Sequence, residues 1–214
     1  MGGASRRRDD RGQAFTLEGV AASLVLVGAL LFAVQSLAAV PNAGDGADPA
    51  TQSDLRQQAD DILVTAANAE TNDLSTLVRN WSQTDRIFAG ARNPRIGYGP
   101  DPPPGDFGAS LDGAFASRSY LYNVYVTYQP RNASEPVGRV PMVYRGNPSD
   151  NAVSTGYTIT LYDNQTLTAP DASWDVELWQ YDTNATNNEN GYYPVPNAVE
   201  GPVYNVVEVR IVVW

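Results

Sequence analysis

The strongest constraint on this chain is an apolar run near its N-terminus, residues 19–40, which contains no charged residue. Its only polar side chains are those of Ser23, Gln35 and Ser36. A helix of this length spans roughly 33 Å at about 1.5 Å per residue, enough to cross a hydrocarbon layer of about 30 Å. We therefore expect a transmembrane helix over residues 19–40.

The charges on either side of this run predict its orientation. Four arginines lie within residues 6–11, whereas no basic residue follows the run before Arg56. Because basic residues favour the cytoplasmic side of a membrane, we expect a cytoplasmic N-terminus and an extracellular segment over residues 41–214. The sequence thus predicts a single-pass protein of the cell membrane, with membrane lipid as its first partner.

The composition limits the partners of the exposed part. All 14 basic residues are Arg, the 24 acidic residues outnumber them, and the formal net charge is -10. An acidic surface repels nucleic-acid phosphates, so we expect no nucleic-acid partner. A Lys-free, carboxylate-rich chain also resembles the proteins of extreme halophilic archaea, in whose surroundings salt screens the repulsion between carboxylates.

The chain lacks His, Cys and Lys, which removes most nucleophilic and zinc chemistry. A pair of carboxylates, Asp175 and Glu177, is expected to be solvated on one strand face. The oxygen-rich segment 182–191 does not fit a calcium loop, because Asn187 stands where Gly is needed and Tyr193 where Glu is needed. We expect no enzyme activity, no catalytic residue, no cofactor and no metal site.

Residues 11–18 read RGQAFTLE and directly precede the apolar run. A basic leader, a small residue, a polar bridge and an apolar helix, in this order, resemble the class III signal peptide of type IV pilins and archaeal pilin-like proteins. The resemblance covers only this N-terminal stretch. It implies that a prepilin peptidase cuts after Gly12 and leaves Gln13 as the new N-terminus. A cut after Ala14, leaving Phe15, is the alternative.

The resemblance also implies that the apolar helix is retained and assembles with other pilin-like subunits. Glu18 would face the positive end of the helix dipole, and it could pair with the α-amine of a neighbouring subunit or stay hydrated. With a cut after Ala14, Glu18 would be residue four of the mature chain, whereas the bacterial pattern has its glutamate at residue five. Small residues would let helices approach closely. They are Gly19, Ala21, Ala22, Gly28 and Ala29.

Two other interpretations of the N-terminal segment remain open. A conventional secretory signal cut near Ala38 would release a soluble domain, although the apolar run is longer than the 7–15 residues typical of such signals. An uncleaved anchor would instead display a non-assembling binding domain outside the cell.

The segment beyond the run predicts an α+β head domain over residues 51–214. Residues 41–50 form a flexible neck, and residues 1–18 form the cytoplasmic leader. Thr51 and Asp54 make a capping-box pattern, followed by an amphipathic helix. Its apolar positions are Leu55, Ala59, Ile62, Leu63 and Ala66. After Asp73 the helical pattern resumes, as a continuation or as a second short helix.

A loop rich in Pro and Gly, residues 93–108, separates the helical part from stretches that alternate in polarity and predict strands. These stretches are 119–129, 139–145, 157–162, 174–181 and 203–214. In the last of them, Tyr204, Glu208 and Arg210 are expected mostly on the outer side, opposite Val203, Val207, Val209, Ile211 and Val213. We expect an antiparallel sheet with the amphipathic helix packed on one face.

Four N-glycosylation sequons lie beyond the apolar run, at Asn80, Asn132, Asn164 and Asn184. Asn132 and Asn184 lie between predicted strands and are the best placed acceptors. The sequence as a whole predicts a pilin-like structural protein of an archaeal cell surface, with a role in filament formation or adhesion.

Overall fold

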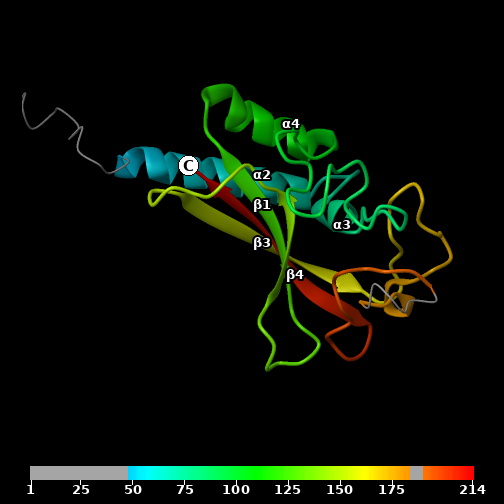
Figure 1. Cartoon of the computed structure of the whole chain (residues 1–214). Helices are drawn as coiled ribbons and strands as arrows, with labels where there is room; N and C mark the ends of the chain where they lie inside the picture. The colour runs from blue at the N-terminus through cyan, green and yellow to red at the C-terminus, as the bar shows by residue number, and fades with distance from the viewer. Residues whose placement is uncertain (1–47, 184–189) are drawn as a thin grey trace, which may run out of the picture. The chain divides into compact units, whose positions relative to one another are not determined.

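The computed structural model describes residues 48–183 and 190–214. They form an α+β fold on a four-stranded antiparallel sheet of order β2-β1-β4-β3 (Figure 1). The strands are β1 (Tyr122–Tyr128), β2 (Gly138–Val143), β3 (Val153–Tyr162) and β4 (Val203–Val213). The predicted antiparallel sheet with a helical layer is confirmed.

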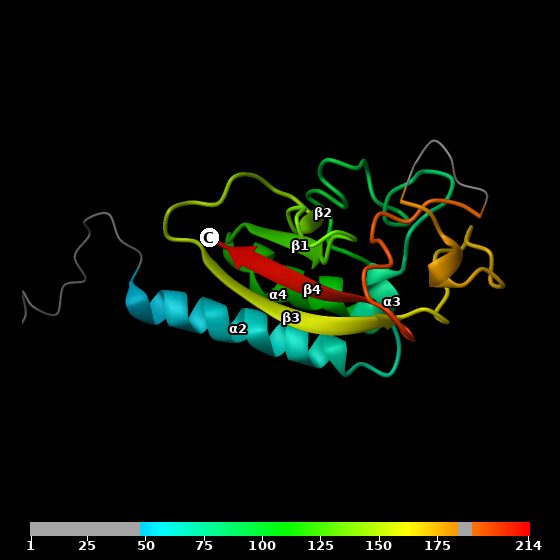
Figure 2. The same cartoon turned by 90° about the horizontal axis from the view of Figure 1, so that it is seen from below.

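The helices lie on one face of this sheet, as Figures 1 and 2 show together. They are α2 (Pro49–Ala67), α3 (Leu74–Val78) and α4 (Gly105–Ala114). The described residues also form two short 3-10 helices, η1 (Ala116–Arg118) and η2 (Leu178–Gln180). Helix α2 packs chiefly on β3 and also contacts α4. Of the five apolar positions that the helical spacing predicts, Leu55, Ala59, Leu63 and Ala66 are buried, whereas Ile62 is partly buried.

Helix α2 begins at Pro49, two residues before the capping box that we expected at Thr51. Proline suits the first turn of a helix because its missing N–H would have no partner there. The neck predicted at residues 41–50 is therefore too long at its C-terminal end, because residues 49 and 50 belong to α2. Residues 41–47 of the predicted neck lie outside the described residues.

The second short helix is present as α3, and its start is fixed by a side-chain cap. The carboxylate of Asp73 accepts a hydrogen bond of 2.8 Å from the backbone N–H of Thr76.

Helix α4 was not predicted, and the expected loop ends at Pro104. Its sequence is rich in Gly and has low helix propensity, but Phe107 and Leu111 are buried. A side chain at Gly108 would clash with the Pro103 carbonyl oxygen, so glycine permits a close approach of the two segments. Tertiary packing outweighs propensity here.

The strand predicted at residues 174–181 is wrong. This segment contains η2, and Trp174 at its start is 86% exposed. The backbone N–H of Glu177 donates to Gln180 Oε1 at 2.8 Å, and Trp179 Nε1 donates to Glu177 Oε2 at 2.7 Å. These local bonds stabilise a turn in place of a sheet ladder.

Strand β4 also departs from simple alternation at its start. Its register against β3 shifts near Tyr204, where β4 carries one extra residue. Tyr204, expected on the outer side, is consequently buried together with Asn205. The amide of Asn205 is fully bonded: it donates to the carbonyls of Gln129 at 3.0 Å and Pro196 at 2.7 Å, and accepts from the Gln129 N–H at 3.1 Å.

No helix in residues 48–183 and 190–214 has the length and apolar character needed to cross a membrane. The leader at 1–18 and the transmembrane helix predicted at 19–40 lie outside the described residues.

Candidate functional site: the open face of the sheet

The face of the sheet turned away from the helices is the part of the described chain that is best arranged to bind a partner. Along β4, Val207, Val209 and Ile211 are fully buried under the helices, whereas the alternate residues Glu208 and Arg210 point the other way. We call this second surface the open face (Figure 2). The strand register places these residues on it: Tyr125, Thr127, Arg139, Ser154, Gly156, Thr158, Val206, Glu208, Arg210 and Val212.

The open face is hollowed into a groove with two adjoining parts. One has a volume of about 670 Å³ and the other about 430 Å³, and both are lined by Thr127, Arg139 and Arg210. The loop that joins β1 to β2 extends to this side of the sheet in Figure 1 and contributes Val137 to the larger part. The groove is therefore bounded by loops as well as by strands.

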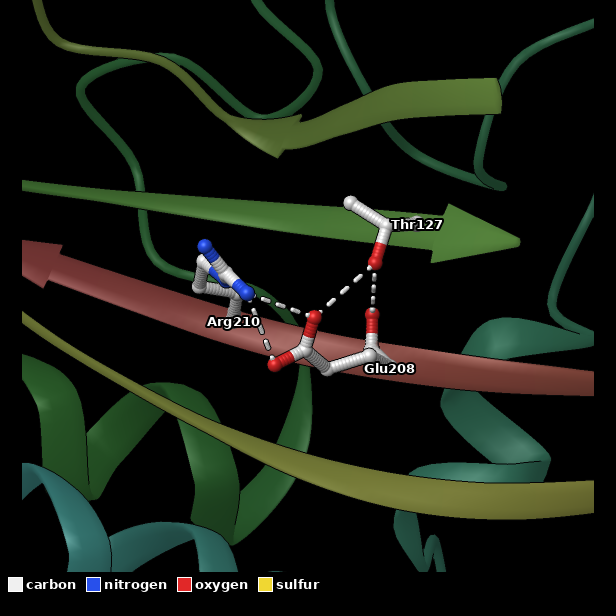
Figure 3. Close-up of polar contacts among 3 residues, drawn as sticks. All are labelled: Thr127, Glu208 and Arg210. Atoms are coloured by element: carbon white, nitrogen blue, oxygen red, sulfur yellow. Dashed lines mark hydrogen bonds and ion pairs between the residues drawn. The ribbon is translucent and has the colours of Figure 1, made fainter. Parts of the chain in front are cut away.

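Strand register brings the polar groups of the groove into a row. Thr127 lies opposite both Arg139 of β2 and Glu208 of β4. Its Oγ1 hydrogen bonds with Glu208 Oε2 at 3.2 Å and with the Glu208 carbonyl oxygen at 3.3 Å. Arg210 Nη2 donates to both carboxylate oxygens of Glu208, at 3.1 and 2.9 Å (Figure 3).

A glycine makes room for this carboxylate. A side chain at Gly156 of β3 would clash with Glu208 Oε1. The absence of a side chain there lets the Glu208 carboxylate lie across the sheet toward β3, where Arg210 reaches it.

The second arginine of the groove is held by an aromatic ring. The guanidinium of Arg139 lies 4.5 Å from the centre of the Tyr125 ring, a cation–π contact. Burial raises the pKa of Tyr125, and the Arg139 charge partly offsets this effect, so the hydroxyl stays protonated near neutral pH. Asn123 Nδ2 donates to that hydroxyl at 3.0 Å and fixes the ring.

The groove is locally positive although the chain is strongly acidic. Arg139 forms no ion pair with any carboxylate in the described part of the chain, and Glu208 neutralises only Arg210. Exposed guanidinium groups beside hydroxyl groups suit carboxylates and other planar anions, which they can bind with two hydrogen bonds. The arrangement is thus suited to bind an acidic partner.

The sites predicted from the sequence lie elsewhere. Asn132 and Asn164 are exposed, in the β1–β2 loop and in the turn after β3, whereas Asn80 is half-buried at the end of α3. The others lie outside the described residues: Gly12, Gln13, Ala14, Phe15, Glu18, Gly19, Ala21, Ala22, Gly28, Ala29 and Asn184.

The carboxylates Asp175 and Glu177 do not share a strand face, since their segment is irregular and Glu177 caps η2. Over residues 48–183 and 190–214, no three carboxylates come together in a way that could hold a metal ion.

Sequence reasoning placed Glu208 and Arg210 on the outer side of the last strand but did not assign them a site. Arg139 and Thr127 were missed as partners, because only the strand register shows that they are opposite each other. The one signal in the sequence was a pair of opposite charges two residues apart on an otherwise apolar strand.

Comparison with known proteins gives one match. The model of a family of unknown function, DUF7288, matches residues 11–213. No curated protein and no solved structure matches the chain.

Proposed function

The chain belongs to DUF7288, a family of unknown function, and from its own residues we propose that it is a pilin-like structural protein of an archaeal cell surface. In this proposal a transmembrane helix over residues 19–40 anchors it, and the α+β domain is displayed outside the cell. Its role is the formation of surface filaments or adhesion, without enzyme activity or a cofactor. The acidic, Lys-free composition suits an extreme halophile.

The observation that carries the proposal is the order of features over residues 11–40: basic leader, small residue, polar bridge and long apolar run. The domain that follows agrees with it, because a helix followed by an antiparallel sheet is also the architecture of a pilin head. Many unrelated domains share that architecture, so the N-terminal stretch is the more specific support.

The exposure of two sequon asparagines fits display of the domain outside the cell. The sequon asparagines Asn132 and Asn164 are exposed on turns, where a glycan could be attached without disturbing packing. Their glycosylation is part of the proposal.

N-terminal sequencing of the mature protein from native membranes tests the proposal. A start at Gln13 or Phe15 supports a pilin-like protein, and the start identifies the bond that is cut. A start at Met1 or Gly2 indicates a plain anchor, and a start beyond Ala38 indicates a secreted domain; either result overturns the pilin-like processing.

Matched variants separate the two candidate bonds. Gly12→Val should block processing if the cut follows Gly12, and Ala14→Val should block it if the cut follows Ala14. Gly3→Val, placed in the leader away from both bonds, is the control. Processing of all three variants at the original rate would contradict the assignment of a prepilin peptidase.

The groove on the open face favours one alternative, a single-pass anchored binding domain that does not assemble. This alternative predicts an unprocessed N-terminus together with monomers in the membrane. The same sequencing experiment, followed by chemical cross-linking in intact membranes, distinguishes it from the pilin-like protein.

A further inference from the structure

The same domain carries an acidic surface apart from the open face, on helix α2. Helix α2 exposes Asp54, Asp60 and Asp61 and a single cation, Arg56. Asp60 accepts a hydrogen bond of 3.3 Å from Thr155 of β3, and Asp61 accepts one of 2.9 Å from Gln57. Val64 of the same helix is 43% exposed. We call this surface the acidic side of α2.

We infer that the groove on the open face binds the acidic side of α2 of a second copy of this chain. The inference rests on the proposed membrane anchoring, because anchoring holds neighbouring copies close together on the same side of the membrane. It adds to that proposal a contact between head domains.

Charge complementarity is the first reason for this pairing. The groove presents two guanidinium groups and one carboxylate, whereas the acidic side of α2 presents three carboxylates and one guanidinium. Arg139 has no ion-pair partner among the described carboxylates and stays oriented by the Tyr125 ring. A carboxylate from α2 of another copy would pair with it.

Apolar groups are matched as well. The groove is lined by Val137 and Val206, which are 63% and 37% exposed. Val64 on the acidic side of α2 offers an apolar side chain that is 43% exposed. Contact between these valines would exclude water from the neighbouring ion pairs and strengthen them.

Geometry is the third reason. The helices lie on one side of the sheet and the groove lies on the other, so the groove and the acidic side of α2 are separate surfaces of each molecule. Such a head-to-tail contact leaves one free surface at each end and can therefore repeat in a row.

The contact is expected to be weak in dilute solution and to depend on anchoring. Exposed ion pairs contribute little to the free energy of binding, and the net charge of -10 makes whole molecules repel each other. Confinement to a membrane raises the effective concentration of the partner, and salt screens the long-range repulsion more than it weakens pairs in contact.

The chain contains no cysteine, so introduced cysteines report contacts cleanly. The full chain carrying Val64→Cys and Val137→Cys should form a ladder of disulfide-linked oligomers in native membranes. Val64 lies on α2, which packs on β3 at one edge of the sheet, and Val137 precedes β2 at the other edge, so a disulfide between them has to join two copies. The control pair, Val64→Cys with Val199→Cys, uses a valine that is 37% exposed and does not line the groove.

Charge reversal then tests the pairing itself. In the double-cysteine chain, Asp61→Arg or Arg139→Glu alone should lower the cross-linked fraction about three- to fivefold, as expected for the loss of one exposed pair. The two changes together should restore much of it. Arg95→Glu, at an exposed position outside the groove, is the control and should leave the fraction unchanged.

Several outcomes overturn the inference. They are a ladder of equal yield in the control pair, no ladder from an anchored and folded chain, and no restoration by the combined reversal. The last two overturn the head-to-tail contact while leaving the anchoring intact. A mature chain that lacks residues 19–40 overturns the anchoring itself, and this inference with it.

Discussion

Neighbouring residues of β4 belong to two different environments. Val207, Val209 and Ile211 are completely buried beneath the helices, whereas Glu208 and Arg210, which alternate with them in sequence, lie in an open groove. Cross-strand contacts on the covered face exclude water, and those on the open face are ion pairs and hydrogen bonds. Since both faces share the same backbone, substitutions on one strand should separate folding from surface contacts.

The largest difference between the faces should appear in stability. Leu63 on α2 is fully buried against the covered face, and its neighbour Val64 is 43% exposed. Leu63→Ala should lower the free energy of unfolding by about 2–5 kcal/mol, through lost burial and the cavity that remains. Val64→Ala, the matched control, should change it by less than about 0.5 kcal/mol. Urea denaturation followed by circular dichroism measures both, and equal losses would mean that α2 is not packed as described.

The next largest effect should come from a polar residue on the covered side. Asn205 is fully buried and its amide satisfies two carbonyls and one N–H. Asn205→Ala leaves the buried carbonyl of Pro196 and the partly buried backbone groups of Gln129 without this partner, and should cost about 1–3 kcal/mol. Asn151→Ala in an exposed turn is the control. A cost near zero would show that water reaches these groups, and that the covered face is less dry than its burial indicates.

Much of the covered face could be predicted from the sequence. Apolar alternation identified β1 and β4, and the helical spacing identified α2, because both patterns are dictated by burial on one side. Helix α4 was missed because its glycines weaken the helix signal. The false strand at 174–181 arose because alternation of apolar residues cannot detect the local hydrogen bonds of Glu177.

The groove was much harder to predict. Arg139 lies next to Thr127 only because β1 pairs with β2 in a register that includes a bulge between Val124 and Tyr125. Such a register depends on packing across the whole sheet, and a polar face carries no periodic signal to indicate it. The sequence showed the charges of the open face but not their neighbours.

The faces can also be compared through pH. Burial raises the pKa of Tyr122, on the covered face, from 10.0 to about 12, although the adjacent Arg145 opposes the rise. The folded state therefore holds this proton more tightly than the unfolded state does. The resulting stability is complete below about pH 10 and is lost as the pH rises from 10 toward 12.

Denaturation midpoints measured at several pH values between 8 and 12 test this effect. Tyr122→Phe should make the alkaline loss of stability less steep, since one titrating group is removed. Tyr162→Phe, at a position that is 46% exposed, is the control. An unchanged slope in Tyr122→Phe would show that this hydroxyl does not contribute to alkaline unfolding.

The smallest effect should come from the open face itself. Glu208 pairs with Arg210 at 2.9 Å, but the arginine side chain is 47% exposed. Glu208→Gln should therefore change the free energy of unfolding by no more than about 0.5 kcal/mol, because solvent screens such a pair. Asp101→Asn, which breaks the exposed pair with Arg92, should have an effect of similar size. Because Glu208→Gln also removes the only carboxylate of the groove while leaving both arginines, it should increase the cross-linked fraction in the double-cysteine chain. A loss of stability as large as that of Leu63→Ala would instead show that the open face helps to hold the fold together, and the contrast between the two faces would fail.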